Sequence, residues 1–288
     1  MKKLFFTLCL FAFCVSFGYA QEASNDNKAT VTQKGDANKL DFAQDGTDNN
    51  ARTEVFGNGN NVILKQHGNK NMADSQSEGD GNRITIDQEG NNNTGLQQIK
   101  ADNVQAMILQ KGNGNIGNQT LNAGDSFAKI KQTGDDNTAI QRQDGFNNKS
   151  TLWQKGNNNF ANSTQDGENN RHVIDQHGNG NQSNLQQMGD SNTSYSAQIG
   201  NTNTLNVVQE GDNNVAGNQD SRLRQRGDNN NLSILQQGNQ NAAFSTQMGD
   251  DNMGNIITRG NGNAVKLTQM GNQNMATIKQ GDKQTPQQ

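Results

Sequence analysis

The sequence predicts an all-β fold, a β-solenoid built from stacked strand-turn-strand coils with cross-β-like order. The motif Gln-x-Gly-x-x-Asn recurs every eleven residues, from Gln33–Asn38 to Gln269–Asn274. Between motifs the side chains alternate in character, which is typical of strands. Large and small alternating pairs follow one another through the first two thirds of the chain. One coil is therefore expected to hold 22 residues, in two 11-residue half-repeats.

The N-terminus has the features of a secretory signal peptide. Lys2 and Lys3 precede an apolar run over residues 4–17, and small residues lead to Ala20, after which we expect cleavage. A lipoprotein signal would acylate Cys14 instead, but Phe13 stands where such signals carry a small residue. Both cysteines, Cys9 and Cys14, lie in the segment to be removed, so no disulfide is expected in the mature chain.

The predicted organisation follows from where the repeat begins and ends. The parts are a signal peptide at 1–20, a polar leader at 21–28, the repeat solenoid at 29–282 and a tail at 283–288. A five-residue insertion falls between Asn214 and Gln225. We interpret it as a bulged turn, with a break between two stacked segments as the alternative.

Composition excludes several functional classes. The hydrophobic content of 29% is low for a globular core, but stacked coils need fewer apolar residues because polar side chains can form ladders. The formal charge of -4 over 288 residues indicates neither a nucleic-acid-binding protein nor a basic membrane-surface protein. We expect no cofactor, no metal, no catalytic residues and no small-molecule substrate.

The inward face of each strand is predicted from the alternation. In the segment 61–67, Val62, Leu64 and Gln66 share one face. Other large inward pairs are Leu40/Phe42, Ile84/Ile86, Ala106/Ile108, Leu205/Val207, Leu232/Ile234 and Val265/Leu267. Small or polar inward pairs are Ala51/Thr53, Ala73/Ser75, Gly95/Gln97, Ala139/Gln141 and Ala161/Ser163.

The repeated Gln, Gly and Asn are the candidate functional residues. In-register stacking places Gln over Gln and Asn over Asn, where amides both donate and accept hydrogen bonds, and the glycine allows a positive φ in the turn. The predicted glutamine ladder comprises Gln33, Gln44, Gln66, Gln88, Gln110, Gln132, Gln143, Gln154, Gln165, Gln176, Gln187, Gln198, Gln209, Gln225, Gln236, Gln247, Gln269 and Gln280. The asparagine ladder comprises Asn38, Asn49, Asn60, Asn71, Asn82, Asn93, Asn115, Asn137, Asn148, Asn159, Asn170, Asn181, Asn192, Asn203, Asn214, Asn230, Asn241, Asn252, Asn263 and Asn274. The turn glycines are Gly35, Gly46, Gly57, Gly68, Gly79, Gly90, Gly112, Gly134, Gly145, Gly156, Gly167, Gly178, Gly189, Gly200, Gly211, Gly227, Gly238, Gly249, Gly260 and Gly271.

The end coils of such a stack expose unpaired strand edges. Natural sheets usually protect edges with prolines, charges or a cap, but the only proline is Pro286 and no capping helix is predicted. An unprotected, self-similar edge is a template for a second copy. The contact does not close on itself, so it produces filaments.

The remaining polar and aromatic residues are interpreted by their positions in the eleven-residue repeat, which decide whether a side chain faces inward or outward. His67 and His177 follow ladder glutamines and are expected in solvent, whereas His172 takes an inward slot. The outward slots of Trp153 and Tyr195 predict solvent exposure. A further pair, Asp144 and Asp166, is spaced to stack like charges and is a candidate brake on premature polymerisation.

The pattern Gln-x-Gly-x-x-Asn-x-Ala, seen at Gln66, Gly68, Asn71 and Ala73, resembles the curlin repeat of curli-type functional amyloid subunits, over about residues 29–282. The resemblance implies secretion through the periplasm and export through an outer-membrane channel. It also implies nucleated polymerisation, with a nucleator subunit, into extracellular adhesive fibres of a biofilm matrix. Whether the chain is the major subunit or the nucleator is left open.

Two other functions compete with a fibre subunit. A soluble monomeric β-solenoid, either a surface adhesin or an ice-binding protein, is the first, but Thr30 and Thr32 begin no continuing threonine column. A carbohydrate-active β-helix enzyme is the second, and it requires longer coils and an acidic cleft that the sequence does not show.

Overall fold

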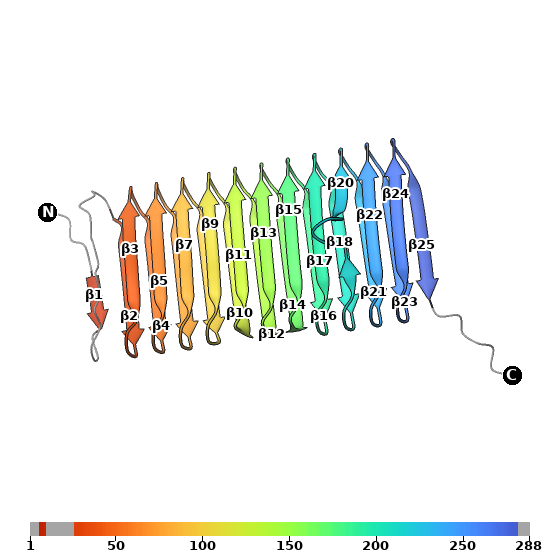
Figure 1. Cartoon of the computed structure of the whole chain (residues 1–288). Helices are drawn as coiled ribbons and strands as arrows, with labels where there is room; N and C mark the ends of the chain where they lie inside the picture. Colours follow the sequence, from red (N-terminus) through yellow and green to blue (C-terminus); the bar gives the residue numbers. More distant parts are fainter. Residues whose placement is uncertain (1–5, 10–25, 282–288) are drawn as a thin grey trace. The chain divides into compact units, whose positions relative to one another are not determined.

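The computed structural model describes residues 6–9 and 26–281, and every regular element in these ranges is a β-strand (Figure 1). No helix in these ranges has the length and apolar character needed to cross a membrane. The chain divides into two compact units, Met1–Asn158 and Asn159–Gln288. Strand β1, Phe6–Cys9, pairs in parallel with the first repeat strand and lies within the predicted signal peptide, whose other residues are outside the described ranges.

Unit 1 consists of two parallel sheets whose strands alternate along the chain. The first sheet contains β2 Lys28–Lys34, β4 Asn50–Phe56, β6 Met72–Glu78, β8 Thr94–Lys100, β10 Ile116–Gly124 and β12 Thr138–Phe146. The second contains β3 Lys39–Asp45, β5 Asn61–His67, β7 Arg83–Glu89, β9 Gln105–Lys111, β11 Phe127–Thr133 and β13 Lys149–Lys155. Each strand pairs with the strand 22 residues on, as at Val62 and Ile84. The predicted all-β solenoid with 22-residue coils is confirmed.

Unit 2 repeats the same arrangement. One sheet contains β14 Phe160–Glu168, β16 Gln182–Met188, β18 Thr204–Glu210, β21 Asn231–Gln237, β23 Met253–Arg259 and β25 Met275–Gly281. The other contains β15 Arg171–His177, β17 Thr193–Ile199, β19 Val215–Ala216, β20 Leu223–Arg226, β22 Ala242–Met248 and β24 Ala264–Met270.

The five-residue insertion lies inside a strand, so its interpretation as a bulged turn is wrong. Strand β19 pairs with the start of β17, and β20 resumes on the same neighbour, with Leu223 opposite Ser196. The intervening residues 217–222 leave the sheet as a loop. Both flanking strands also pair with β22. The stacking therefore continues past the loop, and the alternative of a break is also wrong.

The loop changes the environment of Tyr195, for which the outward slot predicts solvent exposure. This residue faces outward but is only 6% exposed, because it lies at the point on β17 where the loop departs from the paired strand. The guanidinium of Arg171 stands 5.4 Å from the centre of its ring, and Arg222 of the loop bonds Asp175 at 3.1 Å. Trp153, with no such loop beside it, is 40% exposed.

The predicted inward residues form the core of each unit. In unit 1 the large pairs belong to the second sheet, as with Ile84 and Ile86, both fully buried. The facing strands of the first sheet carry small pairs such as Ala73 and Ser75, each 1% exposed. Unit 2 reverses this assignment at β18 and β21, which carry large pairs in the other sheet, and returns to it at β24, where Val265 and Leu267 are buried. Large side chains can change sheets because a coil needs only one large arm for each small one.

Candidate assembly surface: amide ladders and coil edges

A continuous glutamine ladder runs through the second sheet of unit 1. The side-chain Nε2 of each glutamine donates to the Oε1 of the glutamine 22 residues later, over distances of 2.7–3.0 Å from Gln44 to Gln154. The same Nε2 also donates across the coil, as from Gln88 to the carbonyl of Met72 at 2.9 Å. Each buried amide therefore joins neighbouring coils and also joins the two sheets of its own coil. A buried amide is stable when its donors and acceptors are satisfied in this way.

Unit 2 contains two glutamine ladders. One comprises Gln176, Gln198, Gln225, Gln247 and Gln269, joined at 2.8–3.0 Å. The bond from Gln198 to Gln225 spans the inserted loop without a change in geometry. The other ladder comprises Gln165, Gln187, Gln209 and Gln236, joined at 2.8–3.1 Å.

The first sheet of unit 1 does not carry the glutamine ladder that its slots suggest. Gln33 is followed at 22-residue intervals by Val55, Ser77, Ile99 and Leu121. The amide nitrogen of Gln33 is buried without a partner. Val55, Ile99 and Leu121 instead join an apolar cluster with residues of the facing sheet. Four of the five glutamine slots filled by other residues thus stack in one column, and the fifth, Thr258, lies in unit 2.

A displaced ladder, absent from the candidate residues, partly replaces the missing one. Gln97 donates to Gln119 at 2.8 Å, and Gln119 donates to Gln141 at 2.7 Å. These residues occupy the inward slot two positions before the ladder slot. Their own 22-residue spacing in the sequence is the signal that reveals them.

The asparagines form ladders at the start of each strand. The side-chain oxygen of Asn71 accepts from the backbone N–H of Asn93 at 3.0 Å and from its side chain at 3.1 Å. The Asn93 side chain also donates to the carbonyl of Gly112 at 2.8 Å, which fixes the turn of the next coil. Val104 and Ser126 interrupt one column of unit 1, although the N–H of Val104 still donates to Asn82 at 2.8 Å.

The turn glycines are required by close stacking as well as by conformation. Gly112 has φ +119°, and a Cβ placed on it would lie 2.1 Å from the carbonyl oxygen of Gly134. The residue two places later is also left-handed, as at Asn92 with φ 56° or Gly59 with φ 66°. Asparagine and glycine tolerate this conformation, which explains why they predominate at that turn position.

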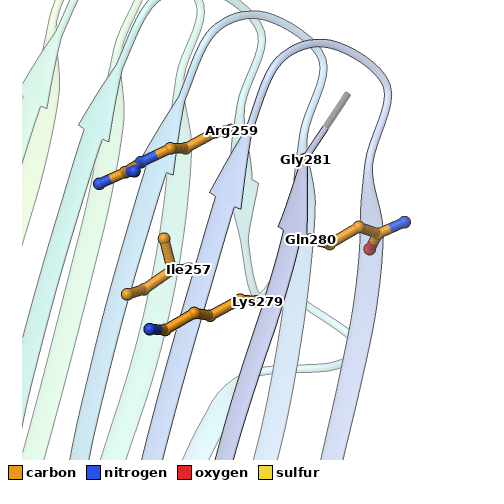
Figure 2. Close-up of a pocket in the computed structure, with 5 residues that line it drawn as sticks. All are labelled: Ile257, Arg259, Lys279, Gln280 and Gly281. Atoms are coloured by element: carbon orange, nitrogen blue, oxygen red, sulfur yellow. The ribbon is translucent and has the colours of Figure 1, made fainter. Parts of the chain in front are cut away.

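The end coils leave ladder groups and core side chains accessible. At the start of unit 1, Leu40 and Phe42 of β3 are only partly buried. At the end of unit 2, the inward residues Ala276 and Ile278 of β25 are likewise only partly buried. Figure 2 shows the outer face of this last coil, where Arg259 and Lys279 border an open pocket of about 240 Å³.

The histidines take three different environments. His67 is exposed and lies 2.8 Å from Asp45, while His177 is half-exposed and lies 2.9 Å from Asp175. His172 is buried, as its inward slot predicts, and its Nδ1 is 2.6 Å from the hydroxyl of Ser163. Burial lowers the pKa of His172 to about 3, because the charged imidazolium would lose its hydration.

The two aspartates proposed as a brake differ in environment. Asp144 accepts hydrogen bonds from Arg142 at 2.6 Å and Asn122 at 2.7 Å. Burial alone would raise the pKa of Asp144, but these bonds and the guanidinium charge lower it below its ordinary value. Asp166 is exposed. Within residues 6–9 and 26–281, no three His, Cys, Asp or Glu side chains gather in a metal-binding arrangement.

A family of known proteins matches two segments of the chain. The family described as the curlin associated repeat matches residues 57–90 and 134–167. No curated protein matches the chain. The first matched segment contains Gln66, Gly68, Asn71 and Gln88, so the family pattern falls on the ladder and turn residues described above.

Proposed function

Because the chain carries curlin associated repeats on a β-solenoid, we propose that it is a secreted structural subunit that polymerises into extracellular amyloid fibres. These fibres serve adhesion and the biofilm matrix. The observation that carries the proposal is the run of amide ladders through stacked coils to strand edges that remain open. The repeats and the fold fit a curli-like structural protein. That this chain polymerises is our inference.

The physical basis of polymerisation is that the end coils lack what interior coils have. An interior glutamine such as Gln88 has glutamine partners on both sides, at 2.9 Å and 2.8 Å. The last one, Gln269, has a glutamine partner on one side, at 2.8 Å, within the described structure. A second copy would complete the ladder, pair the free backbone groups and cover half-buried apolar side chains. Association with a second copy therefore satisfies all three kinds of exposed group at these edges.

The remaining parts of the proposal come from family resemblance. They are passage through the periplasm, export through an outer-membrane channel and a partner subunit that nucleates growth. We also propose that the carboxylates of Asp144 and Asp166 slow polymerisation before export. Replacing both with Asn should shorten the lag of unseeded assembly, and an unchanged lag would contradict this role.

Assembly of the mature chain, residues 21–288, tests the proposed function. We expect seeded growth without a lag and fibre diffraction with cross-β spacings near ~4.8 and ~10 Å. A persistently monomeric protein would refute the proposal and favour a monomeric adhesin.

A matched pair of variants distinguishes growth at the coil edge from nonspecific aggregation. Ile278→Lys places a charge in an inward slot of β25, at the open end of the solenoid, and should abolish growth from that end. Thr277→Lys adds the same charge on the outer face of the same strand, outside the stacked core, and should affect growth far less than Ile278→Lys. Equal inhibition by both variants would show that edge stacking is not the growth step.

A further inference from the structure

We propose a specific junction between successive molecules, in which strand β2 of one copy pairs with β24 of another and β3 pairs with β25. This inference rests on the proposed polymerisation and adds its register. The corresponding residue pairs are Thr32 with Thr268 and Ala43 with Lys279. The rival junction places β2 on β25 and β3 on the side of β24.

Sheet topology favours the proposed junction. Strands alternate between two sheets along the chain, and unit 2 ends with β25, one strand beyond β24. The next strand in the winding would therefore lie against β24. In the proposed junction β2 of the incoming copy fills that position, and β3 then lies on β25. The rival junction leaves a gap one strand wide beside β24, with unpaired backbone groups on both of its sides.

The ladders agree with this register. Each glutamine Nε2 donates to the next coil, so Gln269 is placed to donate to the Oε1 of Gln33 in the incoming copy. Each asparagine oxygen accepts from the next coil, as Asn27 already accepts from the N–H of Asn49 at 2.9 Å. Asn27 itself falls 22 places after Asn263 when the two sequences are joined in this register. The junction therefore continues both ladders into the incoming copy, where the glutamine column ends at Gln33 because Val55 follows it.

The charges on the outer face distinguish the proposed junction from the rival one. Gly281 pairs with Arg259, and Lys279 pairs with Ile257, so two cations flank the pocket shown in Figure 2. The proposed register puts Asp45 over Gly281, and Asp41 lies on the same outer face of the incoming β3. The side chains of Asp41 and Asp45 are 57% and 62% exposed.

The rival register instead brings Lys34 over Gly281, beside the same two cations. Like charges in neighbouring strands are unfavourable, whereas carboxylates at this position are favourable. The inner faces also match in the proposed register, because half-buried Leu40 and Phe42 cover Ala276 and Ile278.

The proposed junction needs the free edge of β2. In the full chain β1 occupies that edge, with Phe6 opposite Ala29. Because β1 lies in the predicted signal peptide, cleavage after Ala20 would free the edge. The cross-linking and charge-reversal experiments therefore use the mature chain, which carries no cysteine of its own.

Disulfide cross-linking reads the register directly. The double variant Thr32→Cys/Thr268→Cys places one thiol at each end, and the proposed junction brings them opposite each other. Neighbouring parallel strands lie about 4.8 Å apart, which a disulfide can span. Thr30→Cys/Thr277→Cys is the matched control for the rival junction. Fibres grown under reducing conditions are oxidised, denatured and separated on a non-reducing gel.

We expect a ladder of covalent multimers from Thr32→Cys/Thr268→Cys and monomer from the control. Multimers from the control alone, from both variants equally, or from neither variant despite fibres would overturn the junction while leaving the proposed function intact. Failure of the unmodified mature chain to form fibres would instead refute the proposed function.

Charge reversal gives a second readout that does not depend on cysteines. Arg259→Glu should slow seeded elongation about twofold to fivefold, the range for exposed charge pairs, and adding Asp45→Arg should restore it. The rival junction predicts the opposite sign, because the introduced carboxylate would then face Lys34 and elongation would accelerate. Acceleration, or no rescue by the second substitution, would contradict the proposed register.

Discussion

The interior glutamine ladder makes a quantitative prediction at Gln110. Its Oε1 accepts from Gln88 at 2.8 Å, and its Nε2 donates to the carbonyl of Thr94 at 2.9 Å and to Gln132 at 2.9 Å. The side chain is 3% exposed. Gln110→Ala removes these bonds and leaves the buried amides of its neighbours short of partners. At about 1 kcal/mol for each bond, the free energy of unfolding should fall by roughly 3 kcal/mol.

Urea unfolding of the monomeric mature chain, held below the concentration at which it assembles, measures this change. Gln98→Ala is the matched control, because Gln98 is exposed and lies on the outer face of a neighbouring strand. Its cost should stay within about 0.5 kcal/mol. In the double variant with Gln88→Ala, the costs should fail to add, since both substitutions remove the same bond. A Gln110→Ala cost as small as that of the control would refute the ladder as a source of stability.

Three further predictions concern the turns, the buried histidine and the loop. Gly112→Ala should lower the free energy of unfolding by at least about 3 kcal/mol, whereas Gly59→Asn, at a left-handed position with no atom within 4 Å of an added Cβ, should be nearly neutral by urea unfolding. Because the folded pKa of His172 lies near 3, below the unfolded value, its stabilising contribution is complete above about pH 6.5 and is lost as pH falls toward 3. Between pH 7 and pH 4.5, His172→Ser should therefore lose about 2–3 kcal/mol less of its free energy of unfolding than the parent does, and an unchanged pH dependence would contradict the assignment. Deleting residues 218–222 should keep the circular dichroism of the parent but expose Tyr195, the only tyrosine of the mature chain, to nitration; loss of the β signal would show that the loop is needed for folding.

The sequence predicted the coil because its two signals are periodic and independent. Alternation assigned Ile84 and Ile86 to the interior, and the eleven-residue spacing assigned the turns. The broken ladder was also present in the sequence, but only when slots are separated into two series of 22. When all the glutamine positions are treated as one series spaced by eleven, Ile99 and Leu121 look like scattered substitutions rather than one apolar column.

The environment of Tyr195 could not be obtained in the same way. The spacing shows that five residues are extra between Asn214 and Gln225, but not where they leave the strand. Turns are the usual place for insertions because they lie outside the hydrogen-bonded ladder. Here the sheet tolerates a mid-strand loop because β17 and β22 hold both flanking segments in register.

That loop has a practical consequence for protein engineering. Residues 217–222 form a loop between β19 and β20, and both of these strands remain paired with β17. The stacking of the coils therefore does not fix the length of the loop. A foreign peptide placed there would project from the side of the solenoid and not from its stacking ends. If the chain polymerises as proposed, such a graft would be displayed once per subunit along the flank of the fibre, a regular array for epitopes or enzymes.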